Sequence, residues 1–299
     1  MHERNSIGCG NYFFSKDNLI KLKESYPTIK IIISNKIRGY SENNNLALKT
    51  AKGKYCCILN DDTILIDNMF EKAINYLNMN PVVAGISPIF LMPNLKMFDM
   101  NTKLLSPWSL IKKELKSFFP LNKLALNYKL RNIEHVLDIK RISGACFIVR
   151  RSILEQIDYM DENFFLGPDD ADLGKRIIDN GYKIRLLPFA KIIHKWRGGE
   201  ITCLAEVKTA TTIISLIQYL EKHYSKICGN AFKLYYFIKS LLTLTFLYMK
   251  KLWKLNYNCY FLISSHKNVL KNIFFYKKSK DIFLALITKY GLYKSIFHE

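Results

Sequence analysis

The chain has 299 residues, of which 49% are hydrophobic and 13% aromatic, and this composition excludes disorder on a large scale. Its formal net charge of +20 implies an anionic partner, and nucleic acid, anionic lipid headgroups and phosphorylated small molecules all satisfy that requirement. The seven cysteines include no CxxC pair, which argues against zinc or dithiol redox chemistry and indicates reduced residues of a cytosolic protein. The N-terminus also lacks the apolar core of a signal peptide.

Helices and strands are predicted to alternate through the first 90 residues. Residues 1–14 contain glycines that break any pattern, and we expect a loop there. The helices are expected from Ser15 to just before Pro27, from Asn43 to Lys52 with Gly53 as C-cap, and after an Asp67 cap. The strands are expected at residues 29–33, 55–59 and 82–90.

This alternation predicts an α/β fold with a mostly parallel sheet and helices on both faces. In such sheets ligands bind beyond the carboxyl ends of the strands, which is where Asp61 and Asp62 fall. Residues 92–138 are divided by prolines into short amphipathic pieces, and we interpret them as a variable insertion that lines an acceptor site.

The pattern resumes with a strand at residues 144–149 and a helix after Arg150. Gly144 at the entry of this strand lets a ligand approach the backbone, or it is an ordinary sheet glycine. A further helix is expected to end at Asn180-Gly181. Two short strands, at residues 183–187 and 190–194, are expected on either side of a turn at Pro188.

An acidic stretch, Phe164-Phe165-Leu166-Gly167-Pro168-Asp169-Asp170-Ala171-Asp172-Leu173, opens that further helix. Three carboxylates this close repel one another and raise one another's pKa, so a fold usually keeps them where a cation or a substrate hydroxyl uses them. The alternative is structural, because aspartates in the first turn of a helix are favoured by capping and by the helix dipole.

The C-terminal part differs in character. Residues 205–299 contain long apolar and aromatic helical runs with many lysines and few acids. The run from Ala231 to Met249 is almost long enough to span a bilayer, but Lys233 and Lys239 within it oppose insertion. A set of basic interfacial helices at a membrane surface is the favoured interpretation, and a helical subdomain packed on the sheet is the alternative.

Several motifs, in order, resemble those of family 2 glycosyltransferases, and the rhamnosyltransferase-like and galactofuranosyltransferase-like members in particular. The motifs are Gly39-Tyr40-Ser41-Glu42-Asn43-Asn44-Asn45-Leu46-Ala47-Leu48, Leu59-Asn60-Asp61-Asp62-Thr63, Gly144-Ala145-Cys146, Asp161-Glu162-Asn163-Phe164-Phe165, Asp169-Asp170-Ala171-Asp172-Leu173 and His194. The resemblance extends from about Ser15 to Gly199. It implies a GT-A fold, a Rossmann-like nucleotide-diphospho-sugar transferase architecture, in residues 1–200, followed by a helical region in residues 201–299.

The resemblance also implies a reaction and the residues that carry it. A sugar moves from a UDP-, dTDP- or GDP-linked donor to an acceptor hydroxyl with inversion, and Mn²⁺ or Mg²⁺ stabilises the leaving diphosphate. Asp170 matches the catalytic base, supported by Asp169 and Asp172. The metal ligands implied are Asp61, Asp62 and His194, and the nucleotide-sugar contacts implied are Gly39, Asn43, Asn44, Asn60, Asp61 and Gly144.

The chain departs from the family at its start, because the apolar first strand and the helix after it are missing. A truncated or misassigned start, a partner chain that supplies the strand, and a degenerate enzyme are the three explanations, and the retained aspartates favour truncation. Arg38 either pairs with the donor phosphates or is a solvated surface residue.

We therefore predict an inverting, metal-dependent glycosyltransferase in the synthesis of cell-surface polysaccharide or glycolipid. Its acceptor is a glycan or a lipid-linked sugar, and the protein is cytoplasmic and peripheral on the anionic inner face of the cell membrane. The alternative is a catalytically inactive, truncated, glycosyltransferase-like scaffold or membrane-surface protein. No nucleic-acid motif accompanies the positive charge, so a nucleic-acid partner is not expected.

Overall fold

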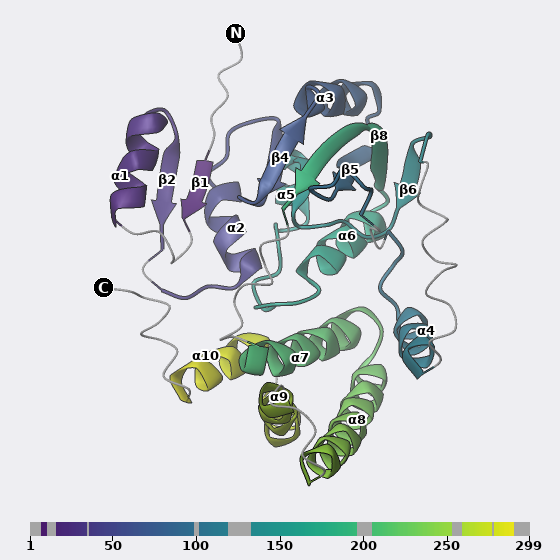
Figure 1. Cartoon of the computed structure of the whole chain (residues 1–299). Helices are drawn as coiled ribbons and strands as arrows, with labels where there is room; N and C mark the ends of the chain where they lie inside the picture. The colour runs from purple at the N-terminus through teal and green to yellow at the C-terminus, as the bar shows by residue number, and fades with distance from the viewer. Residues whose placement is uncertain are drawn as a thin grey trace. The chain divides into compact units, whose positions relative to one another are not determined.

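The computed structural model describes residues 7–10, 16–34, 36–98, 102–118, 133–195, 205–252, 259–276 and 278–289 (Figure 1). Contacts within the chain define two compact units. We call residues 51–160 and 170–199 the sheet unit, and residues 1–50, 161–169 and 200–299 the helical unit. The division expected from the sequence, 1–200 and 201–299, groups the first 50 residues differently, and it stays a prediction.

The sheet unit is built on a six-stranded sheet in which the strands follow the order β3-β7-β5-β8-β4, with β6 paired to β8. The strands are β3 (Tyr55–Leu59), β4 (Thr63–Ile66), β5 (Val83–Leu91), β6 (Leu137–Ile139), β7 (Cys146–Arg150) and β8 (Lys183–His194). The helices are α3 (Met69–Met79), α4 (Pro107–Phe118), α5 (Arg151–Gln156) and α6 (Asp169–Asp179). The expected α/β class is confirmed.

The direction of the strands corrects the expectation of a mostly parallel sheet. In this unit β5 and β8 are parallel neighbours. The other pairings between its described strands, β3 with β7, β7 with β5, β8 with β4 and β8 with β6, are antiparallel. A buried apolar run predicts that a strand lies inside a sheet, but it carries no information about the direction of the neighbouring strand.

The segment after β3 also differs from the expectation. The chain forms β4 before it enters α3, and Asp67 is not the cap of that helix, because Asn68 occupies the N-cap position and makes no side-chain capping bond. Asp67 and Asn68 both have left-handed backbones, with φ of 52° and 49°. Aspartate and asparagine tolerate this conformation better than other non-glycine residues, so the pair turns the chain from strand to helix.

Pro188 does not separate two strands, because β8 runs through it from Lys183 to His194. The pairing of β8 with β5 shifts register at this place, since Leu187 pairs with Pro88 and Lys191 pairs with Ile89. A proline cannot donate to a ladder and is tolerated at such irregular positions. The shift allows one long strand to pair with both β5 and β4.

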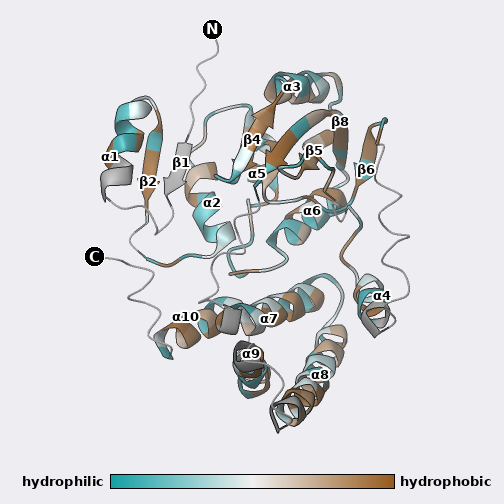
Figure 2. Ribbon diagram, in the orientation of Figure 1, coloured by the Kyte–Doolittle hydropathy of each residue, from teal (hydrophilic) through white to brown (hydrophobic). Residues whose placement is uncertain are grey.

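Both faces of the sheet in the sheet unit are buried, and its strands are largely brown, the colour of hydrophobic residues, in Figure 2. On one face Met69, Ala73 and Leu77 of α3 pack in a single cluster with Cys146 and Ile148 of β7, among others. Side chains alternate between faces along a strand, so Phe147 and Val149 point to the other face. Both of these are 0% exposed, so the second face is covered as completely as the first.

The helical unit combines the N-terminal segment with the C-terminal helices. Its elements are β1 (Ile7–Gly10), α1 (Lys16–Ser25), β2 (Lys30–Ile33), α2 (Tyr40–Leu48), α7 (Ala205–His223), α8 (Lys226–Leu252), α9 (Cys259–Asn272) and α10 (Ser279–Lys289). The strand at 7–10 corrects the expected loop, and it pairs in parallel with β2. The sequence does not predict this strand, because it is only four residues long and contains two glycines, which are rare in strands.

Helix α2 begins at Tyr40 and ends at Leu48, so Gly53 is not its C-cap. Gly39 is the N-cap residue, and a Cβ atom placed there would lie 2.8 Å from both the Cα and the carbonyl oxygen of Phe165. The backbone of Phe165 also accepts a hydrogen bond from the Tyr40 amide at 3.3 Å. A glycine is therefore required for residues 161–169 to pack this closely on the start of α2.

Gly85 offers a test of the packing at the centre of the sheet. A Cβ atom on Gly85 would lie 2.5 Å from Cζ of Phe147 and 2.8 Å from the carbonyl oxygen of Ile148. We expect Gly85→Ala to lower the free energy of unfolding by about 1–3 kcal/mol, the range for overpacked cores, in urea denaturation. Gly174→Ala is the matched control, because the nearest atom lies 3.5 Å away and alanine favours the interior of α6. Equal stability of the two variants would contradict this packing.

Candidate active site

The turn after β3 carries the first group of predicted site residues. The Asn60 amide donates to the Ala145 carbonyl at 2.9 Å, which places the turn beside the Gly144-Ala145 entry to β7. The Thr63 hydroxyl donates to the Asn60 carbonyl at 2.6 Å and closes the turn. Asp61 is exposed at its tip, whereas Asp62 is buried. The structure thus brings Asn60, Asp61 and Gly144 to one edge of the sheet.

Asp62 meets His194 across two antiparallel strands. Thr63, the first residue of β4, pairs with His194, the last residue of β8, so the preceding Asp62 lies beside the His194 side chain. Asp62 Oδ1 and His194 Nε2 are 3.0 Å apart, and each side chain is 11% exposed. The Lys195 amide also donates to the Asp62 carbonyl at 2.8 Å, and the Phe90 ring packs edge-on at 6.2 Å from the His194 ring.

The donors of this pair suit a divalent cation. Carboxylate oxygen and imidazole nitrogen are ligands for Mn²⁺, and carboxylate oxygen is the preferred ligand of Mg²⁺. The two donor atoms already lie within hydrogen-bond distance of each other, at 3.0 Å. Within the residues that the structure describes, no group of three or more His, Cys, Asp or Glu side chains is arranged to hold a metal. The three-residue ligand set therefore stays a prediction.

The three aspartates of the acidic stretch have different surroundings. Asp169, 6% exposed, accepts a hydrogen bond from the Ser41 hydroxyl at 3.0 Å and another from the Gly167 amide at 3.2 Å. Asp172, 0% exposed, forms an ion pair with Arg176 at 2.8 Å. Hydrogen bonds and charge stabilise these two carboxylates, so each has a structural part in holding the start of α6.

Asp170 is the accessible carboxylate of the stretch, with 24% of its side chain exposed. Its Oδ1 accepts a hydrogen bond from the Ala171 amide at 2.7 Å and lies 3.6 Å from Nη2 of Arg141. Burial raises the pKa of Asp170 above its usual value, and Arg141 and the backbone amides offset this rise only in part. A carboxylate with a raised pKa that solvent can reach is suited to accept a proton.

The sequence does not point to Arg141, and its position is set by the packing of α6. Gly174 of α6 faces the backbone of Lys140 and Arg141, with the nearest atoms 3.5 and 3.6 Å from the position of a Cβ. This close approach brings the segment before β7 against the first turns of α6. The contact spans residues far apart in sequence, so no local motif could have identified it.

The predicted nucleotide contacts Gly39, Asn43 and Asn44 lie at the start of α2 in the helical unit. The Asn44 side chain donates to the Tyr40 carbonyl of its own helix at 2.9 Å. Asn45, which was not among the predicted site residues, is 1% exposed and donates to Glu162 at 2.9 Å. Asn45 therefore has a structural role, as does Gly39, which packs against Phe165. The nucleotide contacts of Gly39, Asn43 and Asn44 stay predictions.

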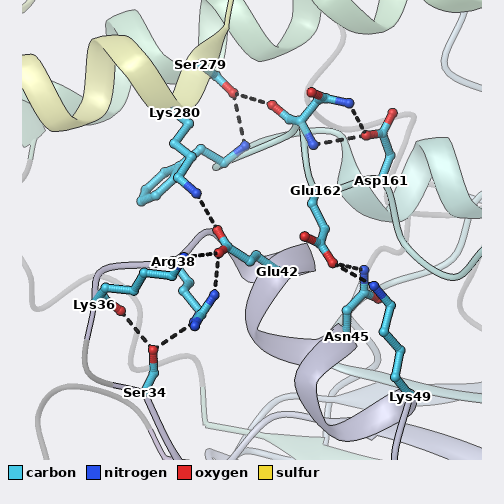
Figure 3. A network of polar contacts seen from close by, with 12 residues as sticks. Ser34, Lys36, Arg38, Glu42, Asn45, Lys49, Asp161, Glu162, Ser279 and Lys280 are labelled. Carbon is cyan, nitrogen blue, oxygen red and sulfur yellow. Dashed lines mark hydrogen bonds and ion pairs between the residues drawn. The ribbon is translucent and has the colours of Figure 1, made fainter.

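Glu42 joins α2 to α10 in a network of charges (Figure 3). Its side chain is 7% exposed, and it forms ion pairs with Arg38, with Lys280 at 2.6 Å and with Lys36 at 3.5 Å. Burial alone would raise the pKa of Glu42, but Lys280 and Arg38 together hold it below its usual value. Arg38 also donates to the Ser34 hydroxyl at 2.8 Å. Its side chain is 16% exposed, so it is not a solvated surface arginine.

The chain is similar to one protein family and, over part of its length, to curated proteins. The model of the family described as Glycosyl transferase family 2 matches residues 14–158. Two curated relatives are N-acetylglucosaminyl-diphospho-decaprenol L-rhamnosyltransferases of Mycobacterium tuberculosis, from strains CDC 1551 / Oshkosh and ATCC 25618 / H37Rv. Each is 32% identical over 78 residues, which are 26% of this chain and 25% of the relative. The matched segment thus spans a quarter of the curated relatives.

Two solved structures are partly similar to this chain. The crystal structure of GalNAc-T7 with UDP, GalNAc and Mn²⁺ has a TM-score of 0.48 at 11% identity, covering 64% of this chain and 37% of that chain. The mannosyltransferase PcManGT from Pyrobaculum calidifontis, in complex with GDP-Man and Mn²⁺, has a TM-score of 0.46 at 12% identity. That similarity covers 98% of this chain and 72% of the mannosyltransferase.

The Arg141 charge is expected to control the titration of Asp170. Because the guanidinium favours the ionised carboxylate, Arg141→Gln should raise the pKa of Asp170 further. Carboxyl ¹³C NMR titration measures this, with the Asp170 signal assigned from its loss in Asp170→Asn. Arg185→Gln is the matched control, because Arg185 is 23% exposed and pairs with Asp138 instead. An unchanged or lowered Asp170 pKa in Arg141→Gln would contradict the assigned contact.

Proposed function

Because the model of glycosyl transferase family 2 matches residues 14–158, we propose that this chain is an inverting glycosyltransferase of that family. It moves a sugar from a nucleoside diphosphate donor to an acceptor hydroxyl. The observation that supports this most directly is Asp170, a partly exposed carboxylate with a raised pKa between two carboxylates that are buried and bonded.

Asp170 acts as the general base in this proposal. The acceptor oxygen bonds to the anomeric carbon while the bond from that carbon to the donor phosphate oxygen breaks. The acceptor proton passes to Asp170, and the electron pair of the broken bond leaves with the diphosphate. Asp169 and Asp172 do not exchange protons with the acceptor, because Ser41 and Arg176 occupy their oxygens and fix the backbone on either side of Asp170.

A divalent cation, Mn²⁺ or Mg²⁺, would neutralise the charge that develops on the leaving diphosphate. Asp62 and His194 would hold it, with Asp61 as a further oxygen donor from the exposed tip of the turn. Two protein ligands are enough for such an ion, because Mg²⁺ is usually bound through one or two carboxylates together with substrate phosphates and water.

The donor and acceptor are assigned by class. Gly39, Asn43, Asn44, Asn60 and Gly144 are the proposed contacts to a UDP-, dTDP- or GDP-linked sugar. The acceptor is proposed to be a glycan or a lipid-linked sugar, in line with the decaprenol-linked substrate in the names of the curated relatives. Cell-surface polysaccharide or glycolipid synthesis is the pathway class that such an acceptor implies.

The proposed location is the cytoplasmic face of the cell membrane, as a peripheral protein. Among the described helices none is both long enough and apolar enough to cross a bilayer. The net charge of +20 favours a surface of anionic lipids. The competing proposal is an inactive scaffold that retains the fold. Calorimetric titration with UDP, dTDP and GDP in the presence of Mn²⁺ separates the two, because a scaffold should bind none of them.

Removal of the proposed base is expected to stop transfer without loss of the fold. Asp170→Asn should lower kcat by about 10²–10⁴-fold, because the amide cannot accept the acceptor proton. The assay measures nucleoside diphosphate release from a panel of sugar nucleotides with acceptor present. Asp179→Asn, at the exposed end of the same helix, removes a charge paired with Lys175 and should leave kcat unchanged. Equal kcat for Asp170→Asn and wild type would remove Asp170 from this role.

Metal dependence is expected to follow the Asp62–His194 pair. Chelation by EDTA should abolish transfer, and added Mn²⁺ or Mg²⁺ should restore it. Asp62→Asn should raise the Mn²⁺ concentration for half-maximal rate by at least about tenfold, because a neutral amide is a weaker ligand than a carboxylate. Asp138→Asn on β6 is the control for loss of one carboxylate from the sheet unit. Full activity in EDTA, or an unchanged Mn²⁺ requirement in Asp62→Asn, would contradict the site.

A further inference from the structure

Helix α8 exposes a row of apolar side chains along most of its length, and much of its ribbon has the brown of hydrophobic residues in Figure 2. The row, which we call the α8 stripe, consists of Ile227, Ala231, Leu234, Ile238, Leu241, Leu242, Phe246 and Met249, all exposed. Most successive members are three or four residues apart, so they share one face of the helix. Leu242 is 65% exposed and Phe246 56%, values that are high for large apolar residues.

The opposite face of α8 already forms a core. Phe232, Tyr236, Ser240, Leu244 and Leu247 recur at the same spacing and are buried. Leu244 and Leu247 pack in one cluster with Ile263 of α9. The α8 stripe is therefore not the face that holds the helix in its bundle. When a helix is apolar on two opposite faces, the face that is not packed in the protein indicates contact with another apolar partner.

The charged residues near the α8 stripe indicate which kind of apolar partner would cover it. Neither α8 nor α9 contains an acidic residue. Lys226 on α8 and Lys267 and Lys271 on α9 are exposed, and Nζ of Lys267 lies 5.5 Å from the centre of the Tyr248 ring. A second copy of the chain would bring lysines against lysines. A bilayer with anionic headgroups offers acyl chains for the stripe and negative charge for the lysines.

We propose that the α8 stripe is the membrane-contacting surface of this protein and lies in the interfacial layer of an anionic phospholipid bilayer. Helix α8 then lies in the plane of the membrane. The proposal deepens the proposed function, because it names the surface that would bring the enzyme to a lipid-linked acceptor. The binding itself requires neither a donor nor catalysis.

The test is sedimentation of the full chain with vesicles that contain no sugar nucleotide or acceptor. Wild type should bind vesicles of phosphatidylcholine and phosphatidylglycerol, and bind phosphatidylcholine alone weakly. Leu242→Ser with Phe246→Ser should lower the partition coefficient for anionic vesicles at least about tenfold, because two large apolar side chains no longer leave water. Lys267→Gln with Lys271→Gln should reduce the preference for anionic over neutral vesicles.

The matched control is Met79→Ser with Val82→Ser in the sheet unit, where the two side chains are 80% and 60% exposed. This variant should bind like wild type, and circular dichroism should show that all three double variants are folded. The proposal would be overturned if Leu242→Ser with Phe246→Ser bound anionic vesicles as tightly as wild type, or if wild type did not bind them. A wild-type dimer that the α8 change dissociates would assign the stripe to a second copy instead. Asp170→Asn should bind vesicles like wild type. The vesicle-binding result therefore does not depend on the outcome of the transferase assay.

Discussion

The need to accommodate three carboxylates within four residues is the constraint on which the proposed site depends. Asp169, Asp170 and Asp172 lie at the start of one helix, and like charges at this spacing disfavour one another's ionisation. The fold compensates two of them with a hydroxyl and a guanidinium, at 3.0 and 2.8 Å. Burial raises the pKa of Asp170, and a guanidinium at 3.6 Å offsets this rise only in part. One carboxylate of the cluster is thereby left suited to proton transfer.

The second part of the proposed site depends on strand pairing. Asp62 and His194 are far apart in sequence and meet because β4 pairs antiparallel with the end of β8. That pairing requires β8 to continue past Pro188, which the register shift against β5 permits. A parallel sheet with a break at Pro188, as the sequence predicts, would give no reason for this contact. The irregularity in β8 is therefore part of what brings together the proposed metal-binding pair.

The elements were predictable from sequence where the signal was local, and were missed where a distant partner decided the outcome. The expected strand at residues 55–59 coincides with β3, because five consecutive residues carry the apolar run of a buried strand. The Asp67 cap was wrong by one residue, since the backbone conformation of Asp67 and Asn68 depends on β4 before them. In the site, the motif residues were found by resemblance, whereas Arg141 and Lys280 were not. Each of them lies far in sequence from its partner, Asp170 or Glu42, so no local pattern connects the two.

The C-terminal helices are part of the structure that holds the segment leading to Asp170. The Ser279 hydroxyl of α10 accepts a hydrogen bond from the Phe165 amide at 3.0 Å, and the ring of Phe283 stacks on that of Phe165 at 4.0 Å. Lys280 in the same helix neutralises buried Glu42 of α2. Losing these contacts would leave a buried carboxylate with fewer cations, which is costly. A fragment without α10 would therefore lose support for residues 161–169, the segment of the helical unit that leads to Asp170.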